Sequence, residues 1–276
     1  MSTPSNYVLG QSTHEYERLM LQAKLLRPYT ERYFRAAGLG PGMRVLDLGS
    51  GMGDVALLAG DIVGPGGRVL GLDRDATGLE RARARAADHG CASWVSFEAT
   101  NLEDFASSEM FDAVVGRYIL LYQADAGATI RQLLRFLKPG GIVAFHELDF
   151  TDPHSSYPPC EYWDRVYHLV SDVFRRGGAP PDFGRRVGKA FLDAGLPFPT
   201  ISADIVAGGG RGSYLYPWIA NTLISLAPRM AAVGLTLPPD VPADHTLAAK
   251  LEAASIAAGT QIMGPTQVGA WVRKLL

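Results

Sequence analysis

The chain has 276 residues, 47% of them hydrophobic, which is enough for one sizeable core with an added lobe. The formal net charge of -2 gives no basic surplus for a nucleic-acid partner, and no apolar run reaches the roughly 20 residues of a membrane span. Cys91 and Cys160 are too few for a disulfide framework, and Met1–Gly10 has no signal-peptide core. We therefore expect a cytoplasmic protein with ordinary thiols and without nucleic-acid or membrane partners.

The first expected element is a helix from about His14 to Ala37, which Ser12-Thr13 would cap. Pro28 is expected to kink this helix or to divide it in two. The preceding stretch Tyr7-Val8-Leu9-Gly10 has two open interpretations, a segment that folds over a ligand or a frayed terminus.

A glycine-rich turn follows the first predicted strand, Val45–Leu48. Gly49, Gly51 and Gly53 stand at alternate positions, and a helical pattern begins at Val55. Strand, glycine turn and helix are typical of the opening of a nucleotide-binding βαβ unit. The glycines allow a sharp turn and a close approach of the backbone to a ligand. A dinucleotide fingerprint would carry its last glycine one position later, where Asp54 stands.

The second predicted strand, Arg68–Asp73, ends in an acid 24 positions after Gly49. This offset is close to the roughly 20 residues at which an acid contacts a ribose in βαβ folds. A carboxylate there can accept hydrogen bonds from both ribose hydroxyls. The alternative is that Asp73 caps the next helix.

The chain continues with alternating helices and strands, which predicts a doubly wound parallel sheet. The arginines of the predicted helix Thr77–His89 are expected to form a solvated face. The expected elements are a helix Thr77–His89, a third strand Trp94–Glu98, a fourth strand Met110–Gly116, a helix Ala126–Leu137 and a fifth strand Ile142–Glu147, entered through a Lys138–Gly141 turn.

Four motifs in this order resemble the class I S-adenosylmethionine (SAM) methyltransferases over about Arg44 to Asp149. They are the acid-x-Gly-x-Gly-x-Gly run from Asp47, the strand-ending Asp73, Phe111-Asp112, and the tetrad Lys138-Pro139-Gly140-Gly141. The resemblance implies a Rossmann-like α/β sheet of seven strands, the last antiparallel, with N-terminal helices and a helical lid before the final strand. It also implies SAM as the cofactor.

The resemblance places cofactor contacts at the ends of the first four strands. The leading helix also resembles that of bacterial small-molecule methyltransferases, which implies that Gln22 reaches the methionine moiety unless it is simply a polar residue on the helix surface. Thr100 or Asn101 stands where the family usually has an acid for the adenine. The implied contacts are Gln22, Asp47, Gly49, Ser50, Gly51, Asp73, Arg74, Thr100, Asn101, Leu102 and Arg117.

A base is needed only if the acceptor must lose a proton. The candidates at the ends of the fourth and fifth strands are Tyr118, His146, Glu147 and Asp149, and we favour His146 with Tyr118. A structural histidine is the alternative. His146, Asp149, Asp152 and His154 do not have the spacing of a compact ligand motif, so we expect no metal.

Beyond Asp149 the pattern changes. The expected elements are an aromatic-rich helix at Tyr162–Val170, a helix Val187–Leu196, a sixth strand Thr200–Val206, helices Tyr214–Ala232 and Leu247–Ala258, and a last strand Val268–Val272. The predicted divisions are an N-terminal cap (1–42), a core (43–207), a lid (208–263) and a returning strand (264–276). The alternative role for the lid is a dimerisation element in a homodimer.

Aromatic residues after Asp149 predict an apolar or aromatic small-molecule acceptor, of the kind used in secondary metabolism. They are Tyr157, Trp163, Tyr167, Tyr214 and Trp218. The fourth strand leads into Arg117–Leu120 and not into the (N/D)-P-P-(Y/F) tetrad of nucleic-acid amino-methyltransferases.

The predicted function is therefore SAM-dependent methylation of a small organic molecule. A SAM-binding protein of this fold that performs a cyclisation or senses the cofactor is the first alternative. An NAD(P)-dependent oxidoreductase is disfavoured by the glycine spacing and by the lack of a Tyr-x-x-x-Lys motif.

Overall fold

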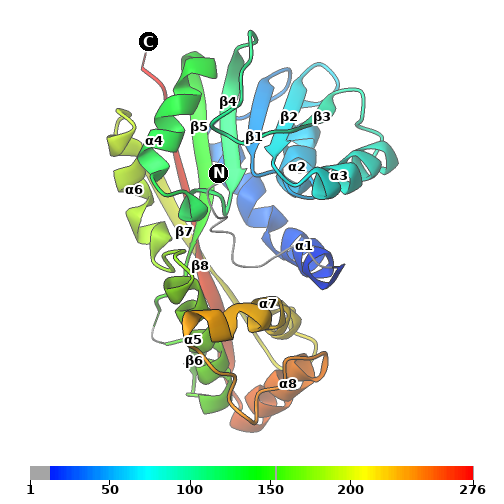
Figure 1. Ribbon diagram of the computed structural model, residues 1–276, viewed down its shortest axis with the longest axis vertical. Coiled ribbons are helices and arrows are strands. Elements are labelled where there is room, and N and C mark those ends of the chain that lie inside the picture. The colour runs from blue at the N-terminus through cyan, green and yellow to red at the C-terminus, as the bar shows by residue number, and fades with distance from the viewer. Residues whose placement is uncertain (1–12, 153, 276) are drawn as a thin grey trace. The chain divides into compact units, whose positions relative to one another are not determined.

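The computed structural model describes residues 13–152 and 154–275, which form a mixed α/β fold (Figure 1). The predicted segment at Tyr7–Gly10 and the cap residue Ser12 lie outside the described residues. The elements, in chain order, are α1 (Thr13–Ala36), β1 (Arg44–Leu48), α2 (Asp54–Val63), β2 (Arg68–Asp73), α3 (Ala76–Asp88), β3 (Val95–Ala99), β4 (Phe111–Arg117), η1 (Leu120–Tyr122), α4 (Ala126–Leu133), η2 (Leu134–Phe136), β5 (Leu137–Asp149), β6 (Ser156–Tyr157), α5 (Glu161–Arg176), α6 (Phe183–Asp193), β7 (Thr200–Gly209), α7 (Leu215–Met230), η3 (Ala231–Val233), α8 (Thr246–Ala258) and β8 (Gln261–Arg273).

The described strands form one eight-stranded sheet in the order β3-β2-β1-β4-β5-β8-β6, with β7 also paired to β8. The pairs β2–β3, β1–β2, β1–β4 and β4–β5 are parallel, and β6–β8 is antiparallel. This arrangement confirms the predicted doubly wound, mostly parallel sheet with a late antiparallel strand. Parallel strands end at the same edge, so the ends of β1, β2 and β4 meet where such folds bind ligands.

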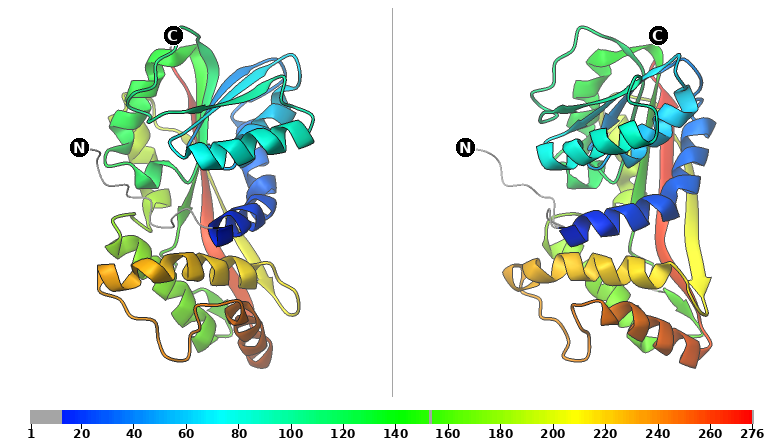
Figure 2. Two further views of the ribbon diagram at one scale, coloured as in Figure 1. Left: turned by 45° about the vertical axis from the view of Figure 1, so that its right-hand side comes forward. Right: turned by 90° about the vertical axis from the view of Figure 1, so that its right-hand side faces the viewer.

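The core of the nucleotide-binding half is built on β1 and α2. Residues Val45 to Leu48 of β1 are buried, and eight of the residues of α2 are buried as well. A helix that is apolar on nearly all sides must lie inside the protein. Helices α2 and α3 lie against the β1–β3 part of the sheet (Figure 2). Gly60 on α2 permits this approach, because a Cβ there would lie 2.6 Å from Val95 Cγ2.

The chain divides into two compact units. One comprises residues up to Leu25, Leu148–Gly184 and Ala203–Gln267, and the other comprises Leu26–Glu147, Arg185–Ser202 and the end of the chain from Val268. In the first unit, α5, α7 and α8 pack against one another. Trp163 and Tyr216 meet edge to face with ring centroids 6.0 Å apart. The aromatic helix after β5 thus shares a unit with the helices predicted as a lid.

Several element boundaries differ from the sequence expectations. Helix α1 is continuous and carries Pro28 inside it, so a division at Pro28 is wrong and the kink stays a prediction. The Lys138–Gly141 tetrad belongs to β5, where the register to β4 shifts between Phe111 and Ala113 and Gly140 has a φ of 73°. The Lys138–Gly141 sequence resembled a turn because Gly140 has a left-handed conformation at this irregularity in the strand.

The last strand is also longer than predicted and begins at Gln261. Gly264 and Pro265 obscured its first half, because both residues are usually found outside strand interiors. A Cβ on Gly264 would lie 3.0 Å from Leu215 Cδ2 and 3.1 Å from Trp218 Cζ3, so the glycine lets α7 pack on β8. The two-residue strand β6 had no periodicity to detect.

Candidate functional site

The glycine turn between β1 and α2 contains three left-handed residues, with φ of 64° at Gly49, 52° at Gly51 and 81° at Gly53. A Cβ on Gly49 would lie 2.5 Å from Ile119 Cδ1, and one on Gly53 would lie 2.9 Å from Phe97 Cζ. A Cβ on Gly51 would meet no described atom within 4 Å. Two of the glycines are therefore required by packing, while the third borders open space at the carboxyl ends of the strands.

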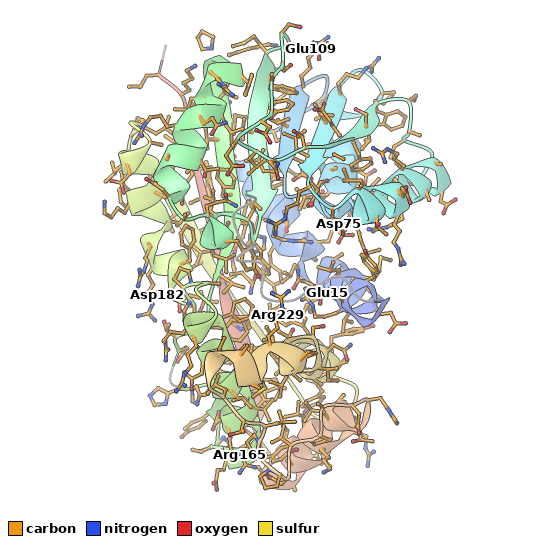
Figure 3. The ribbon with its side chains drawn as sticks, in the orientation of Figure 1. Glu15, Asp75, Glu109, Arg165, Asp182 and Arg229 are labelled. Carbon is orange, nitrogen blue, oxygen red and sulfur yellow. The ribbon has the colours of Figure 1, made fainter. Side chains whose placement is uncertain are left out.

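Asp73 ties the end of β2 to this turn. Its Oδ2 accepts a hydrogen bond from Gly51 N at 2.8 Å, and its Oδ1 accepts one from Asp75 N at 2.8 Å. The residue that caps α3 is Asp75, whose side chain accepts from Thr77 N (Figure 3). Burial raises the pKa of the Asp73 carboxyl, and the two N–H donors oppose this. Asp73 is thus placed beside the glycine turn and is not the helix cap.

Asp47 on β1 is fully buried, and neither of its carboxylate oxygens has a hydrogen-bond partner among the described residues. Burial raises the pKa of this carboxyl to about 7, and the nearby carboxyls of Asp73 and Asp54 add to the rise. The Ser50 hydroxyl and the Arg117 guanidinium act in the opposite direction. The Ser50 hydroxyl is also buried without a described partner. Buried polar groups are normally hydrogen-bonded, so this pair is suited to a cationic or hydroxyl-bearing ligand.

We predict that Asp47 makes the stability of the free protein depend on pH. Its pKa is about 7 in the folded chain against an ordinary 3.8, so the folded state keeps a proton that the unfolded state releases. The contribution of Asp47 to stability is greatest below pH 4 and is lost as the pH rises to about 7, by up to about 1.4 kcal/mol per pH unit. Urea unfolding of the parent and Asp47→Asn between pH 5 and 8 measures this. If the free energy of unfolding changes equally with pH in the two proteins, the prediction is wrong.

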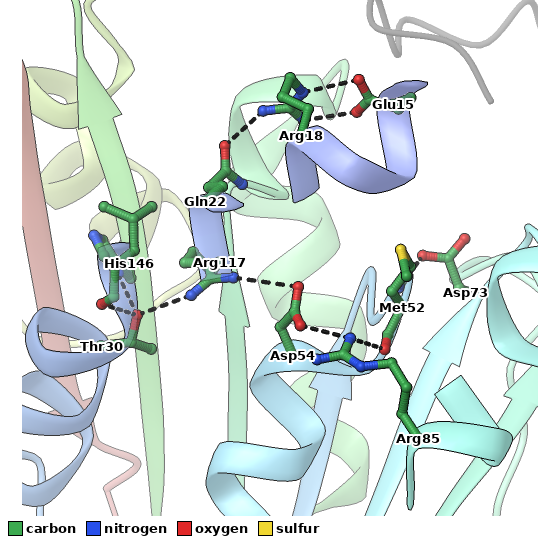
Figure 4. A network of polar contacts seen from close by, with 12 residues as sticks. Glu15, Arg18, Gln22, Thr30, Met52, Asp54, Asp73, Arg85, Arg117 and His146 are labelled. Atoms are coloured by element: carbon green, nitrogen blue, oxygen red, sulfur yellow. Dashed lines mark hydrogen bonds and ion pairs between the residues drawn. The ribbon is translucent and has the colours of Figure 1, made fainter. Parts of the chain in front are cut away.

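A chain of polar contacts runs from the glycine turn to β5 (Figure 4). Arg85 Nη1 lies 2.6 Å from Asp54 Oδ1 and donates to Met52 O at 2.6 Å. Arg117, at the end of β4, has its Nη2 3.8 Å from Asp54 Oδ2, and its Nη1 donates to Thr30 Oγ1 at 3.3 Å. The expectation that the α3 arginines form a solvated face is therefore wrong for Arg85.

The predicted base His146 is fully buried on β5. Its Nδ1 lies 2.9 Å from Thr30 Oγ1, which is also 3.1 Å from Leu26 O. The Thr30 hydroxyl carries one hydrogen, so it donates either to Leu26 O or to the imidazole Nδ1, and this choice sets the tautomer of His146. The Tyr33 ring meets the imidazole edge-on with centroids 5.0 Å apart.

The second predicted catalytic residue, Tyr118, follows β4 directly. Its N–H donates to His146 O at 2.9 Å, and its ring centroid lies 5.6 Å from that of His146. Tyr118 has a φ of 55°, a conformation that non-glycine residues rarely adopt. The structure therefore brings the two predicted catalytic residues together.

The remaining predicted cofactor residues of this unit lie after β2 and β3. Arg74 is exposed next to Asp73, and Thr100 N donates to Asp73 O at 2.9 Å. The Asn101 side-chain amide donates to Asp104 Oδ2 at 2.8 Å. Leu102 O accepts from Gln132 Nε2 at 3.0 Å. The loop after β3 is thus tied to Asp73 through its backbone.

Gln22 belongs to the other unit and is buried rather than on the helix surface. Its Oε1 accepts from Arg18 Nη1 at 2.7 Å and from Trp218 Nε1 at 3.4 Å. Arg18 also pairs with Glu15 through two hydrogen bonds of 2.8 and 2.6 Å. The Gln22–Trp218 hydrogen bond links α1 to α7 within this unit, and the Arg18–Glu15 pair holds Gln22 in place through Arg18.

The predicted acceptor residues fall into two groups in the same unit. Trp163, Tyr167 and Trp218 are buried, whereas Tyr157 is 76% and Tyr214 is 52% exposed. The buried Tyr167 hydroxyl has no hydrogen-bond partner among the described residues, and burial raises its pKa. This hydroxyl is the member of the set most suited to a polar atom of an acceptor.

Three residues of the site were missed or ranked low from sequence. Thr30 was expected only as one position of the predicted helix His14–Ala37. Asp54 was noted only because it stands where a dinucleotide fingerprint has its last glycine, and Glu147 was one of four base candidates. In the structure Thr30 contacts His146, and Asp54 forms ion pairs with two arginines. Glu147 accepts hydrogen bonds from two backbone N–H groups. Asp54 and Glu147 carried a sequence signal, an acid in the first turn of a helix and an acid at a strand end, whereas Thr30 carried none.

Within the described ranges, no three of the His, Cys, Asp and Glu residues are grouped in a way that could hold a metal ion. None of the helices in those ranges has both the length and the apolar character needed to cross a bilayer.

Comparisons with known proteins bear on the family of the chain. Residues 39–175 match a family model described as a methyltransferase domain. The chain is 36% identical over 163 residues to an arsenite methyltransferase of Aquipseudomonas alcaligenes, covering 50% of this chain and 47% of that protein. It is 37% identical over 128 residues to a 2-phytyl-1,4-naphtoquinone methyltransferase of Synechococcus elongatus, covering 46% and 53%. The chain thus spans about half the length of these relatives.

Among solved structures, the [4+2]-cyclase SpnF superposes with a TM-score of 0.54 at 21% identity, covering 91% of this chain and 81% of that one. With the glycine turn and the sheet order, the family match identifies residues 39–175 as a class I SAM-dependent methyltransferase domain. The resemblance seen in the sequence is confirmed, and SAM is the cofactor of this class.

Proposed function

We propose that this protein transfers a methyl group from SAM to a small organic acceptor of apolar or aromatic character. The observation that carries the proposal is the Gly51–Asp73 hydrogen bond beside open space, together with the unpartnered carboxyl of Asp47 on the adjacent strand β1. When bound, SAM supplies a methyl group that is already activated on a sulfonium, so the protein's part is mainly to position the acceptor.

The residues around the glycine turn are suited to hold this cofactor. Asp73 would accept from the ribose hydroxyls, since each of its oxygens retains acceptor capacity beyond its one backbone N–H. Asp47 with Ser50 would receive the methionine ammonium group, which is the kind of cation a buried unpaired carboxyl requires. Gly49 and Gly51 would let the backbone approach.

The loops after β2, β3 and β4 would complete the cofactor site. Arg74, Thr100, Asn101 and Leu102 would border the adenosine, and Arg117 would contribute positive charge near the methionine carboxylate. Gln22 remains a proposed contact for the methionine moiety from α1. A homodimer and a cytoplasmic location also remain predictions.

The acceptor is inferred from two observations. The matched relatives are named for arsenite and for a naphthoquinone, both small molecules. The unit with α5, α7 and α8 is rich in aromatic side chains, and its Tyr167 hydroxyl has no described partner. Trp163, Tyr167, Trp218, Tyr157 and Tyr214 are the proposed acceptor residues, and an aromatic or quinone-like molecule with one polar atom would suit them.

The test is a thermal-shift panel with SAM, S-adenosylhomocysteine, NAD and NADP. A ligand that binds the folded state raises the Tm by mass action, so SAM and S-adenosylhomocysteine are expected to raise it and the nicotinamide cofactors are not. Acceptors are then screened by the appearance of S-adenosylhomocysteine. A Tm that rises with NAD alone would refute the proposal.

His146 with Tyr118 is the proposed base pair for an acceptor that must lose a proton. We expect His146→Gln to lower kcat for such an acceptor by about 100-fold or more, the usual contribution of a general base. The Kd for S-adenosylhomocysteine should change less than about threefold, because His146 contacts Thr30, Tyr33 and Tyr118, which lie outside the glycine turn. Steady-state kinetics and calorimetry measure the two. An unchanged kcat would make His146 a structural residue.

A SAM-binding protein without methyl transfer is the second candidate. The same fold occurs in the [4+2]-cyclase SpnF, which shows that this fold also serves other chemistry. Binding of SAM with conversion of an acceptor but no release of S-adenosylhomocysteine would support this candidate.

A further inference from the structure

The side chain of Glu147 on β5 faces the turn that follows β4. It is fully buried, and its Oε1 accepts hydrogen bonds from Ile119 N at 3.1 Å and Leu120 N at 2.8 Å. Its Oε2 has no hydrogen-bond partner among the described residues. One side chain thus holds two consecutive backbone N–H groups that start η1, where no side chain of the turn itself provides a cap.

The turn held in this way is strained and touches the cofactor region. Tyr118 has a φ of 55°, and such a residue costs about 1–3 kcal/mol unless its surroundings hold it. Ile119 lies directly over the glycine turn, because a Cβ on Gly49 would be 2.5 Å from Ile119 Cδ1. The same side chain lies against Gly116, where a Cβ would be 2.8 Å from Ile119 Cγ2.

We propose that Glu147 is a positioning residue of the cofactor site, which clamps the turn after β4 so that Ile119 supports Gly49 and Tyr118 keeps its place beside His146. The two amide hydrogen bonds oppose relaxation of Tyr118 from one side, and the bond from Tyr118 N to His146 O opposes it from the other. The consequence for SAM binding rests on the proposed function, whereas the clamp itself does not.

The protonation of Glu147 agrees with this role. Burial raises its pKa to about 8, against the opposing effect of the N–H groups of Leu120, Ile119 and Leu121. The protonated form of the acid therefore predominates at pH 7, with its proton on the oxygen that accepts no hydrogen bond. Glutamine has the same shape and one carbonyl oxygen, so it can replace the neutral acid in this position.

The test compares Glu147→Ala with Glu147→Gln. In the ligand-free protein, hydrogen exchange at the amides of Ile119 and Leu120 should accelerate at least tenfold in the alanine variant and less than twofold in the glutamine variant, since two buried donors lose their acceptor only in the former. The Kd for S-adenosylhomocysteine should rise about tenfold in the alanine variant and return to within about twofold of the parent in the glutamine variant.

Asp112→Ala is the matched control. Asp112 also holds a backbone donor, Arg44 N at 2.8 Å, together with Lys138 Nζ at 2.7 Å, but at the amino ends of the same strands. Glu109 marks that end of the sheet, opposite Asp75 (Figure 3). The control should lower the Tm and leave the Kd unchanged. Equal weakening of binding by Asp112→Ala and Glu147→Ala would overturn the proposal, because the effect would then be general destabilisation.

Unchanged exchange and unchanged Kd in Glu147→Ala would also overturn it. If that variant does not fold, Ile119→Ala removes the contact to Gly49 and leaves the Glu147 hydrogen bonds in place. A raised Kd in Ile119→Ala supports the clamp, and a parental Kd refutes it. If the parent itself binds no S-adenosylhomocysteine, the proposed function fails, and exchange at Ile119 and Leu120 still decides the role of Glu147.

Discussion

Replacing Asp73 with alanine is expected to weaken S-adenosylhomocysteine binding by about 100-fold, because each hydrogen bond to a charged group contributes about 1.5–3 kcal/mol and the carboxylate would hold two ribose hydroxyls. The substitution also removes the acceptor of Gly51 N, so the glycine turn loses its link to β2. Isothermal titration calorimetry with S-adenosylhomocysteine measures the change. A thermal-shift series with the same ligand should show little or no rise in Tm.

Asp75→Ala is the control for this prediction. Asp75 is the neighbouring acid that caps α3 through Thr77 N, and loss of a helix cap costs about 1 kcal/mol of stability. This variant should lower the Tm and keep the parental Kd. If Asp73→Ala binds as tightly as Asp75→Ala, Asp73 does not contact the cofactor and serves only the turn.

The second large effect is expected from Gly51→Ala. Gly51 borders open space, so a methyl group there would meet the ligand rather than the protein. The left-handed φ of 52° costs alanine about 1 kcal/mol, a small loss of stability. The Kd for S-adenosylhomocysteine should rise on the order of 100-fold, since only glycine lets the backbone approach a ligand this closely. Calorimetry and urea unfolding separate the two effects.

Gly259→Ala, at the end of α8, provides the comparison. Gly259 has a φ of 59° and a ψ of 35°, in the left-handed region, and a Cβ there would also meet no described atom within 4 Å. Its backbone cost should therefore be similar to that of Gly51→Ala, about 1 kcal/mol, while binding stays parental. A similar Kd in both variants would mean that the space beside Gly51 is not where the cofactor lies.

The glycine turn and Asp73 could be predicted because their signals are local. A run of buried apolar residues defines β1, and glycines at alternate positions define a left-handed turn without reference to any other segment. The spacing to Asp73 follows from the length of one βαβ unit. The same local signals misplaced the start of β8, since Gly264 and Pro265 conceal a strand that long-range packing stabilises.

The contacts around His146 could not be predicted in this way. Thr30 precedes His146 by 116 positions, and Glu147 follows the amides that it binds by 28 and 27 positions. Nothing in a helix pattern marks Thr30 as a partner of an imidazole. Such pairs depend on which helix packs on which strand, and this is settled by the whole core.

The amino-acid sequence by itself determined the doubly wound sheet, the glycine turn and the acid at the end of β2, because backbone conformation and hydrophobic periodicity are properties of neighbouring residues. The tertiary structure alone decided which polar groups lose contact with water. Asp47 and Glu147 are buried with unpartnered oxygens, whereas Asp75, two positions from Asp73, merely caps a helix. Burial depends on segments distant in the chain, and it raises the pKa of Asp47 and of Glu147 toward neutrality.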